Sequence, residues 1–194
     1  MLASELSYRG VSCIVLEKKP DTSDSAKAVL INCRTMEHFR RIGLQNKVQD
    51  ASYPLELPLS VTSGLTLLGD RTLFSTKLDS AADVLSERGK RYIMYVPGAS
   101  PTCTMMCPQY RLEPVLKNHL QTAGNVTLLY SCEATSLTHD DSGVTVQARH
   151  TSGGGVVTTR TFMAQYAVGT DGGSSWVRKQ LGIHTYGKFV VSRA

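Results

Sequence analysis

In YAVGTDGGSSWVRKQL, residues 166–181, a short apolar run breaks at Asp-Gly-Gly and a helix follows, and this change of pattern indicates the fold class. Ala167 and Val168 predict a buried strand, and the paired glycines permit a positive φ or a close approach of the backbone to a ligand. One of the two serines that come next caps a helix, which we expect to end near residue 181. A strand, a turn and a helix N-terminus in this order are typical of a site for a phosphate or a ribose.

Asp171 and Gly172 lie at the centre of this turn. The carboxylate of Asp171 can accept hydrogen bonds from ribose hydroxyl groups, while the free amides and the dipole of the helix N-terminus favour an anion. A turn and a helix cap without any ligand commonly have the same composition. Both interpretations stay open on this stretch alone.

Length and composition bound the class of protein. The chain has 194 residues, of which 41% are hydrophobic, enough for one sizeable core. The net charge of +5 comes from scattered lysines and arginines, so nucleic acid is not a predicted partner and a small anion fits equally well. Five scattered cysteines and the lack of a secretory segment or an apolar stretch of about 18 residues predict a reduced cytoplasmic protein without a membrane span. Cys103 and Cys107 lack the further ligands of a zinc site, so no metal is predicted.

The first residues predict a second nucleotide-binding feature. Residues 1–9 form a helix that Gly10 ends, and VSCIVL at 11–16 reads as a buried strand with Glu17 and Lys18 at its carboxyl end. In a dinucleotide-binding βαβ unit, an acid at this position binds the ribose hydroxyls of an adenine nucleotide. An ordinary solvated carboxylate is the alternative, and the chain contains no GxGxxG loop.

Arg34 precedes the next predicted helix. Residues 29–33 read as a strand, and RTMEHFRRIGL at 34–44 places Met36, Phe39 and Ile42 at helical spacing toward a core. We expect Arg34 just before that helix, where an arginine beside backbone amides can contact a phosphate. A structural role is equally compatible with the sequence.

Gln109 and Arg111 precede a third helix. PQYRLEPVLKNHLQTA at 108–123 has apolar residues at helical spacing, and Pro114 is tolerated only in the first turn. The helix is therefore predicted to start near residue 112 or 113, with Gln109 and Arg111 at its entrance. His119, further along, is expected to be a half-buried surface residue.

The other segments predict sheet structure. Residues 54–104 contain four prolines and short alternating runs at 65–68 and 92–96, typical of hairpins and loops on a nucleotide-binding core, without a recognisable catalytic constellation. Residues 131–165 alternate polar and apolar positions between turns, which predicts an antiparallel β-meander with one wet face. We expect residues 11–16, 126–129 and 167–168 to be parallel neighbours in the core, with the meander attached antiparallel.

Four segments in order, GVSCIVLEKKP, INCRTMEHFRRIGL, CPQYRLEPVLKNHL and VGTDGGSSWVRKQLGI, resemble the FAD-dependent aromatic hydroxylases, flavoprotein monooxygenases of the p-hydroxybenzoate, phenol and polyketide hydroxylase type. The resemblance implies an α/β fold: a single, incomplete, Rossmann-like FAD-binding domain over residues 1–194, with a substrate-side insertion at about 54–104 and the meander at about 131–165. It also implies FAD as cofactor, NADPH or NADH as electron donor, and hydroxylation of an aromatic or polyketide-type substrate, as in secondary metabolism.

The resemblance assigns a role to each matching residue and leaves the catalytic residues unidentified. It implies that Glu17, with Lys18 beside it, binds the adenosine ribose, and that Arg34 contacts the pyrophosphate or the ribityl region. Gln109, with Arg111 beside it, is assigned to the ribityl chain. Asp171 and Gly172 form an Asp-Gly motif that contacts the cofactor and is linked to NADPH use, and Arg178 supports that motif. Ligands of open α/β sheets bind outside the carboxyl ends of the strands. We therefore expect Glu17, Arg34, Gln109 and Asp171 to gather along one sheet edge.

The departures from the family pattern carry expectations of their own. The GxGxxG loop should lie before Met1 and a second flavin-binding motif after Ala194, so we expect the chain alone to bind FAD poorly and an added strand with GxGxxG to improve binding. The strand at 11–16 should then expose an edge that invites self-association or association with another chain. A non-catalytic remnant, an accessory or binding protein, or a redox-inactive small-molecule binder or cyclase on the same scaffold is the alternative function.

Overall fold

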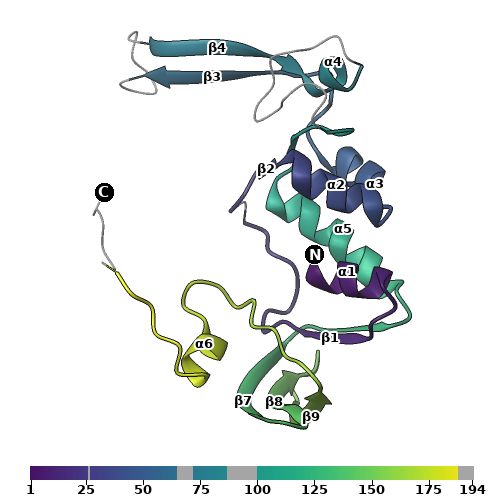
Figure 1. Cartoon of the computed structure of the whole chain (residues 1–194), viewed down its shortest axis with the longest axis vertical. Helices are drawn as coiled ribbons and strands as arrows, with labels where there is room; N and C mark the ends of the chain where they lie inside the picture. Colours follow the sequence, from purple (N-terminus) through teal and green to yellow (C-terminus); the bar gives the residue numbers. More distant parts are fainter. Residues whose placement is uncertain (26, 65–71, 87–99, 188–194) are drawn as a thin grey trace. The chain divides into compact units, whose positions relative to one another are not determined.

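The computed structural model describes residues 1–25, 27–64, 72–86 and 100–187. They divide into two compact units, Met1–Val15 with Asp21–Leu128 and Leu16–Pro20 with Leu129–Ala194. Figure 1 labels the helices and strands in chain order: α1 (Leu2–Tyr8), β1 (Cys13–Leu16), β2 (Leu30–Ile31), α2 (Cys33–Arg41), α3 (Gln45–Ala51), β3 (Pro58–Gly64), β4 (Thr72–Ser80), α4 (Ala81–Leu85), β5 (Met105–Met106), α5 (Gln109–Gln121), β6 (Val126–Leu129), β7 (Cys132–Asp140), β8 (Gly143–Thr151), β9 (Val157–Ala164) and α6 (Trp176–Gln180).

The reversal from α1 to β1 is held by Asn125. The Ser7 hydroxyl donates to the Asn125 side chain at 2.7 Å, and the Asn125 amide group donates to the carbonyls of Ser7 and Val11, both at 3.3 Å. Gly10 has a φ of +75°, a conformation that glycine adopts at little cost, so α1 ends there as predicted.

Strands β1 and β6 form a parallel pair. The Cys13 amide donates to the Asn125 carbonyl at 3.0 Å, and the Glu17 amide donates to the Leu129 carbonyl at 2.9 Å. Both partners advance in the same chain direction, which is the parallel ladder. The prediction for these two strands is confirmed.

The core of the first unit forms around α2. Met36 and Phe39 are fully buried and Ile42 is buried, as their spacing predicts. The Asn32 side chain accepts from the Thr35 amide at 2.9 Å and caps the helix, so α2 begins at Cys33. The prediction that Arg34 lies before the helix is therefore wrong: Arg34 is the second residue of α2.

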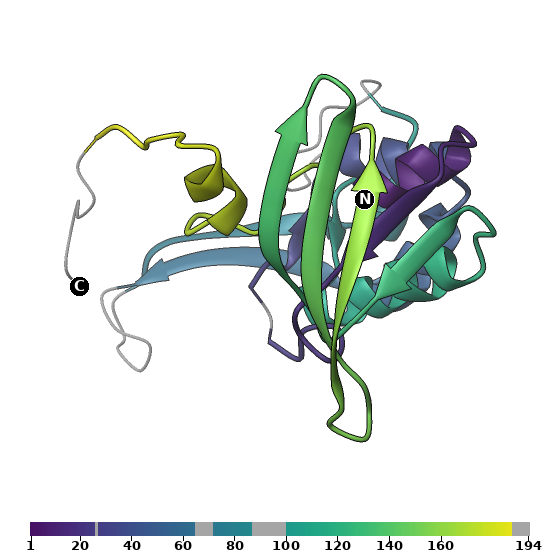
Figure 2. The ribbon, with the colours of Figure 1, turned by 90° about the horizontal axis from the view of Figure 1, so that it is seen from below.

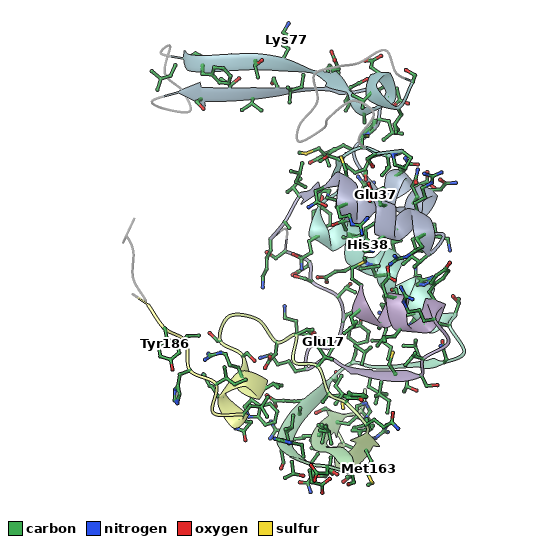
Figure 3. All side chains as sticks on the ribbon, in the orientation of Figure 1. Glu17, Glu37, His38, Lys77, Met163 and Tyr186 are labelled. Carbon is green, nitrogen blue, oxygen red and sulfur yellow. The ribbon has the colours of Figure 1, made fainter. Side chains whose placement is uncertain are left out.

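A charged cluster ties α1 to α2. Arg41 donates to the Glu5 carboxylate at 2.5 Å, and the His38 ring nitrogen Nδ1 lies 3.2 Å from the same oxygen; Figure 3 labels His38 on α2. The hydrogen bond from Arg41 is the main cause that lowers the pKa of Glu5. Glu5 therefore stays ionised and keeps the two helices joined at neutral pH.

Helix α5 starts earlier than predicted. It begins at Gln109 and contains Pro114 as an interior residue, where proline removes one amide hydrogen bond. Leu112, Val115 and Leu116 pack against the buried core, and this burial offsets the missing bond. His119 is half-buried, as predicted, and burial lowers its pKa.

The segment between α3 and β5 contains the predicted kind of hairpin. Strands β3 and β4 pair antiparallel, with Val61 opposite Thr76 and Thr62 opposite Ser75. Ser80 then caps the short helix α4 by accepting from the Asp83 amide at 3.1 Å. The runs predicted at 65–68 and 92–96 lie outside the described residues.

The second unit contains the predicted meander. Strands β7, β8 and β9 lie side by side in that order, and both pairs are antiparallel (Figure 2). Asp140 pairs with Gly143 across a two-residue turn, at the position that the sequence predicts.

The strand predicted at Ala167 and Val168 does not form. These residues have no regular secondary structure, and the neighbouring residue Tyr166 and Val168 itself are 84% and 64% exposed. A strand needs a neighbour that pairs with its backbone, and in the part of the chain that the structure describes no strand pairs with this run.

Within the described ranges, no helix combines the length and the apolar character needed to cross a bilayer.

Gly143 is expected to be a position where only glycine fits. Its φ is +145°, and a Cβ atom there would lie 2.6 Å from the Ala164 carbonyl oxygen. We predict that Gly143→Ala lowers the midpoint of thermal unfolding, followed by circular dichroism, by about 3 to 10 °C through backbone strain. Gly153→Ala is the matched control in the next turn, because a Cβ atom there meets nothing within 4 Å. Equal midpoints for the two variants would contradict this assignment.

Candidate cofactor site

Asp171 caps α6 with its own carboxylate. Oδ2 accepts from the amides of Trp176 at 2.6 Å and Val177 at 3.0 Å, and Oδ1 accepts from the Ser175 hydroxyl. The Ser175 hydrogen bond, followed by the Val177 amide, lowers the pKa of Asp171 to about 2. Ser175 caps the helix as predicted and accepts from the Arg178 amide at 3.0 Å. The amides that the sequence predicts for a bound anion are therefore taken by the chain itself.

Two glycines shape the turn before α6. Gly172 has a φ of +85°, in agreement with the predicted need for glycine. At Gly169 a Cβ atom would lie 2.8 Å from Cβ of Val177, so the backbone and α6 are in close contact there. The requirement at Gly169 was not predicted, although a glycine two residues before the aspartate is visible in the sequence.

Arg178 stabilises the turn that follows α6. Its Nη1 donates to the Ile183 carbonyl at 3.1 Å. Its backbone amide is held by Ser175, which also donates to Asp171, so Arg178 is linked to the Asp171 turn through the helix cap.

Glu17 is half-buried at the end of β1, with Lys18 exposed beside it; Figure 3 labels Glu17. The Glu17 amide donates to the Leu129 carbonyl, and the Glu17 carbonyl accepts from the Cys132 amide, both at 2.9 Å. The Lys19 amide donates to Oε1 of Glu17 at 2.8 Å. The backbone of Glu17 is thus fixed on both sides, and one oxygen of its carboxylate is held by the chain.

Arg34 presents its guanidinium group from the first turn of α2. The side chain is 73% exposed, and Nη1 donates to Glu37 Oε2 at 2.6 Å. This hydrogen bond is the main cause that lowers the pKa of Glu37. A guanidinium group has five N–H donors, so one exposed ion pair leaves donors for an anion.

Gln109 and Arg111 lie in the first turn of α5 and contact different neighbours. The Gln109 side-chain amide donates to the Glu113 carboxylate, and the Gln109 backbone amide donates to the Ala28 carbonyl at 2.8 Å. Arg111 Nη1 donates to the Ser52 carbonyl at 3.4 Å.

The candidate residues are shared between the two units. Arg34, Gln109 and Arg111 belong to the first unit, and Glu17, Lys18, Asp171 and Gly172 belong to the second. Their gathering along one edge stays a prediction.

Glu113 is a polar residue of this region for which the sequence motifs predicted no role. It lies four residues after Gln109, the spacing at which side chains meet on one face of a helix. A glutamine and a glutamate at this spacing form a hydrogen-bonded pair, so the signal was present in the motif QYRLE.

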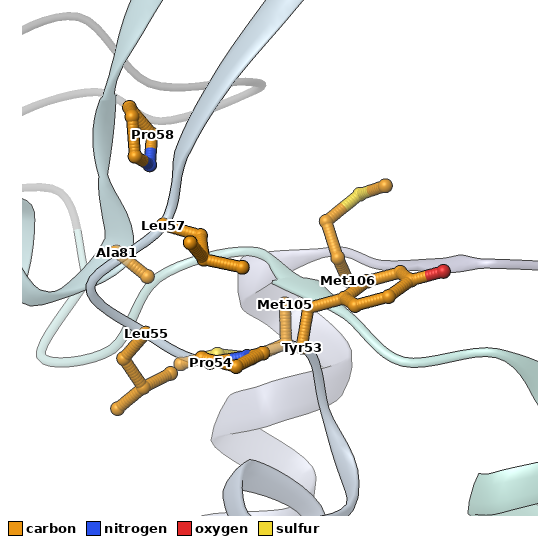
Figure 4. A pocket seen from close by; sticks show the side chains of 8 residues that line it. All are labelled: Tyr53, Pro54, Leu55, Leu57, Pro58, Ala81, Met105 and Met106. Atoms are coloured by element: carbon orange, nitrogen blue, oxygen red, sulfur yellow. The ribbon is translucent and has the colours of Figure 1, made fainter.

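An apolar pocket of about 200 Å³ lies in the first unit, at the base of the β3–β4 hairpin (Figure 4). None of its lining side chains carries a charge, so it suits an uncharged apolar group; they are Tyr53, Pro54, Leu55, Leu57, Pro58, Ala81, Met105 and Met106. Methionine sulfur and a tyrosine ring make favourable contacts with aromatic groups.

Comparison with known proteins decides the family. A family model described as FAD binding domain matches residues 1–193. The chain belongs to the FAD binding domain family.

Known proteins that are similar to this chain are much longer than it. It is 29% identical over 191 residues to a 4-methyl-5-nitrocatechol 5-monooxygenase of Burkholderia sp., covering 97% of the chain and 32% of that protein. It is 32% identical over 181 residues to a phenol 2-monooxygenase of Pseudomonas sp., covering 91% and 27%. Among solved structures, the flavin-dependent monooxygenase PieE in complex with FAD and substrate has a TM-score of 0.76 and 30% identity, over 93% of the chain and 29% of that protein. The chain spans about a third of these relatives.

The residues of this FAD binding domain fit the cofactor unequally. The guanidinium group of Arg34, the carboxylate of Glu17 and the amide of Gln109 match phosphate, ribose and ribityl groups in charge and hydrogen-bonding type. The carboxylate of Asp171 is engaged by α6, whereas Gly172 and Gly173 have open space where a Cβ atom would lie. From this turn, the backbone of the two glycines fits close contact with a ligand better than the aspartate side chain does.

The cap formed by Asp171 gives a testable pH dependence. Because its folded pKa of about 2 lies below the ordinary value, the cap is present at neutral pH and is lost as the pH falls through about 2. We predict that Asp171→Ala at pH 7 speeds amide hydrogen exchange at Trp176 and Val177 and changes the emission of Trp176, the single tryptophan.

Asp141→Ala is the control, because it removes an exposed carboxylate from the β7–β8 turn of the same unit. In wild-type protein the Trp176 emission should stay constant from neutral pH down to about pH 3. Unchanged exchange at both amides in Asp171→Ala would show that the carboxylate does not hold α6.

Proposed function

We propose that this chain binds FAD and serves in the hydroxylation of an aromatic or polyketide-type substrate, with NADPH or NADH as electron donor. The observation that carries the proposal is the similarity, over 93% of the chain, to a monooxygenase whose structure holds both FAD and substrate. FAD, when bound, supplies the redox and oxygen chemistry, and the protein supplies binding and orientation.

Arg34 is proposed to bind the pyrophosphate. Its guanidinium group is largely exposed, and its ion pair with Glu37 lies on the surface. Such exposed pairs contribute little to stability, whereas a hydrogen bond to a charged group contributes about 1.5 to 3 kcal/mol. A phosphate therefore competes well for this side chain.

Glu17 and Gln109 are proposed to bind hydroxyl groups of the cofactor. The backbone hydrogen bonds on both sides of Glu17 hold its carboxylate at the strand end, where it accepts from ribose hydroxyls. Gln109 is fixed at the start of α5 by its backbone bond to Ala28 and accepts from the ribityl chain. Lys18 and Arg111 add positive charge near these contacts.

The uncharged pocket at the base of the β3–β4 hairpin is proposed to take an apolar part of the substrate, consistent with an aromatic compound. The cytoplasmic location and the association through an exposed strand edge stay predictions.

A non-catalytic binding protein that has lost tight flavin binding is the second candidate. The engagement of the Asp171 carboxylate by α6 favours it, because an aspartate assigned to cofactor contact is here used for structure. Flavin binding separates the two candidates.

Arg34→Ala should weaken FAD binding by about tenfold or more, the loss expected for a hydrogen bond to a charged group. The measurement is a titration followed by quenching of flavin fluorescence. Arg40→Ala is the matched control: it removes the same charge from an exposed position of α2, six residues away on another face of the helix, and should change the affinity less than about twofold.

Equal weakening in both variants would show that Arg34 acts only through net charge. If wild-type protein leaves flavin fluorescence unchanged at all concentrations, the FAD proposal fails and the second candidate is supported.

A further inference from the structure

A short stretch between β1 and β2 is fastened to α5. We call its four contacting residues the strap: Asp21, Ser23, Ala28 and Val29. As the strap advances along the chain its partners move back along the sequence, from Lys117 to Glu113, Gln109 and Cys107, so strap and helix run in opposite directions.

Each strap contact is a hydrogen bond or an ion pair. Lys117 Nζ lies 2.6 Å from the Asp21 carboxylate, and the Ser23 amide donates to Glu113 Oε2 at 2.7 Å. The carbonyls of Ala28 and Val29 accept from the backbone amides of Gln109 and Cys107 at 2.8 and 2.7 Å. Since partners four residues apart lie on one face of the helix, the strap covers that face.

Glu113 uses its two carboxylate oxygens for different partners. Oε2 accepts from the Ser23 backbone, and Oε1 accepts from the Gln109 side-chain amide. In this contact the Gln109 amide nitrogen is the donor and the carboxylate oxygen is the acceptor, so the nitrogen faces Glu113. The carbonyl oxygen of the Gln109 amide then faces away from Glu113 and is presented as an acceptor.

We propose that Glu113 is a positioning residue for the flavin site, which sets the Gln109 amide so that its carbonyl oxygen accepts from a ribityl hydroxyl. This inference rests on the proposed binding of FAD. The Ser23 amide keeps the Glu113 carboxylate in place, because a backbone donor in a fastened strap has little freedom to move. Glu113 itself does not touch the cofactor and acts through Gln109.

Removal of Glu113 frees the Gln109 amide. The side chain then adopts both amide orientations and several rotamers, and only some of these present the oxygen to the ribityl hydroxyl. Glu113→Ala should therefore weaken FAD binding by about fivefold to tenfold, the change expected for one hydrogen bond.

A double-mutant cycle separates positioning from general support of the fold. Gln109→Ala should weaken FAD binding by a similar factor, and the double variant Gln109→Ala with Glu113→Ala should lose no more than about twofold beyond it, because interacting residues are not additive. If Glu113 only supported the fold, the loss of FAD affinity in the double variant would be the product of the two single losses. That result would overturn the proposal.

A variant with the two side chains exchanged tests the positioning role by retained binding rather than by loss. Gln109→Glu with Glu113→Gln places the carboxylate at position 109 and the amide donor at position 113. The two side chains still form a hydrogen bond with each other. The amide oxygen at position 113 accepts from Ser23, and the carboxylate at position 109 still has an acceptor oxygen that faces outward. This variant should bind FAD within about twofold of wild type, even if Glu113→Ala fails to fold, and a loss of about fivefold or more would overturn the proposal.

Lys117→Ala is the control. It breaks the ion pair with Asp21, one turn further along α5 than Glu113, and leaves the Gln109–Glu113 pair intact. It should change FAD affinity less than about twofold, and a loss equal to that of Glu113→Ala would assign the effect to the strap as a whole and overturn the positioning role.

If wild-type protein does not bind FAD, the proposed function fails first and this inference fails with it. If wild-type protein binds and Glu113→Ala binds equally well, only this inference fails.

Discussion

The packing of α5 is the constraint on which the first unit depends. Leu112, Val115 and Leu116 bury the helix against the core, while Gln109, Glu113 and Lys117 hold the strap. The strap leads into β2, whose pairing with β5 brings the chain to the entrance of α2. The position of Arg34 in the first turn of α2 thus follows from contacts made on another helix.

Local partners decide which polar residues are available to a ligand. Arg34 and Glu37 form one exposed ion pair, which contributes little and is easily exchanged for a phosphate. Asp171 accepts hydrogen bonds from two backbone amides and a hydroxyl. A ligand that displaced these donors would leave the first turn of α6 without its cap. The sequence predicted both residues to lie close to a helix N-terminus and to contact a ligand, but their hydrogen-bond partners separate them.

Sequence patterns predicted the elements whose cause is local. Helical spacing identified the buried side chains of Met36 and Phe39, and alternation with turn residues identified the meander and its turn at Asp140 to Gly143. The family was also recognisable, because four motifs in order carry more information than any one of them.

The sequence predictions are wrong or incomplete where contacts between distant parts of the chain determine the local structure. A strand at Ala167 and Val168 needs a pairing partner that propensity cannot supply. The interior position of Pro114 depends on tertiary burial of the residues around it, which the local rule for proline ignores. The link from Glu113 to Ser23 spans 90 positions and has no local signal, although its bond to Gln109 does.

Binding of FAD by the motif residues can be followed residue by residue, by titrating isotope-labelled protein with FAD and recording the amide chemical shifts. We expect the amides around Glu17, Arg34, Gln109 and Gly172 to shift together with one binding curve, while those around Gly153 in the β8–β9 turn stay constant. Shifts confined to other parts of the chain, or no saturable shift at any of the four, would contradict it.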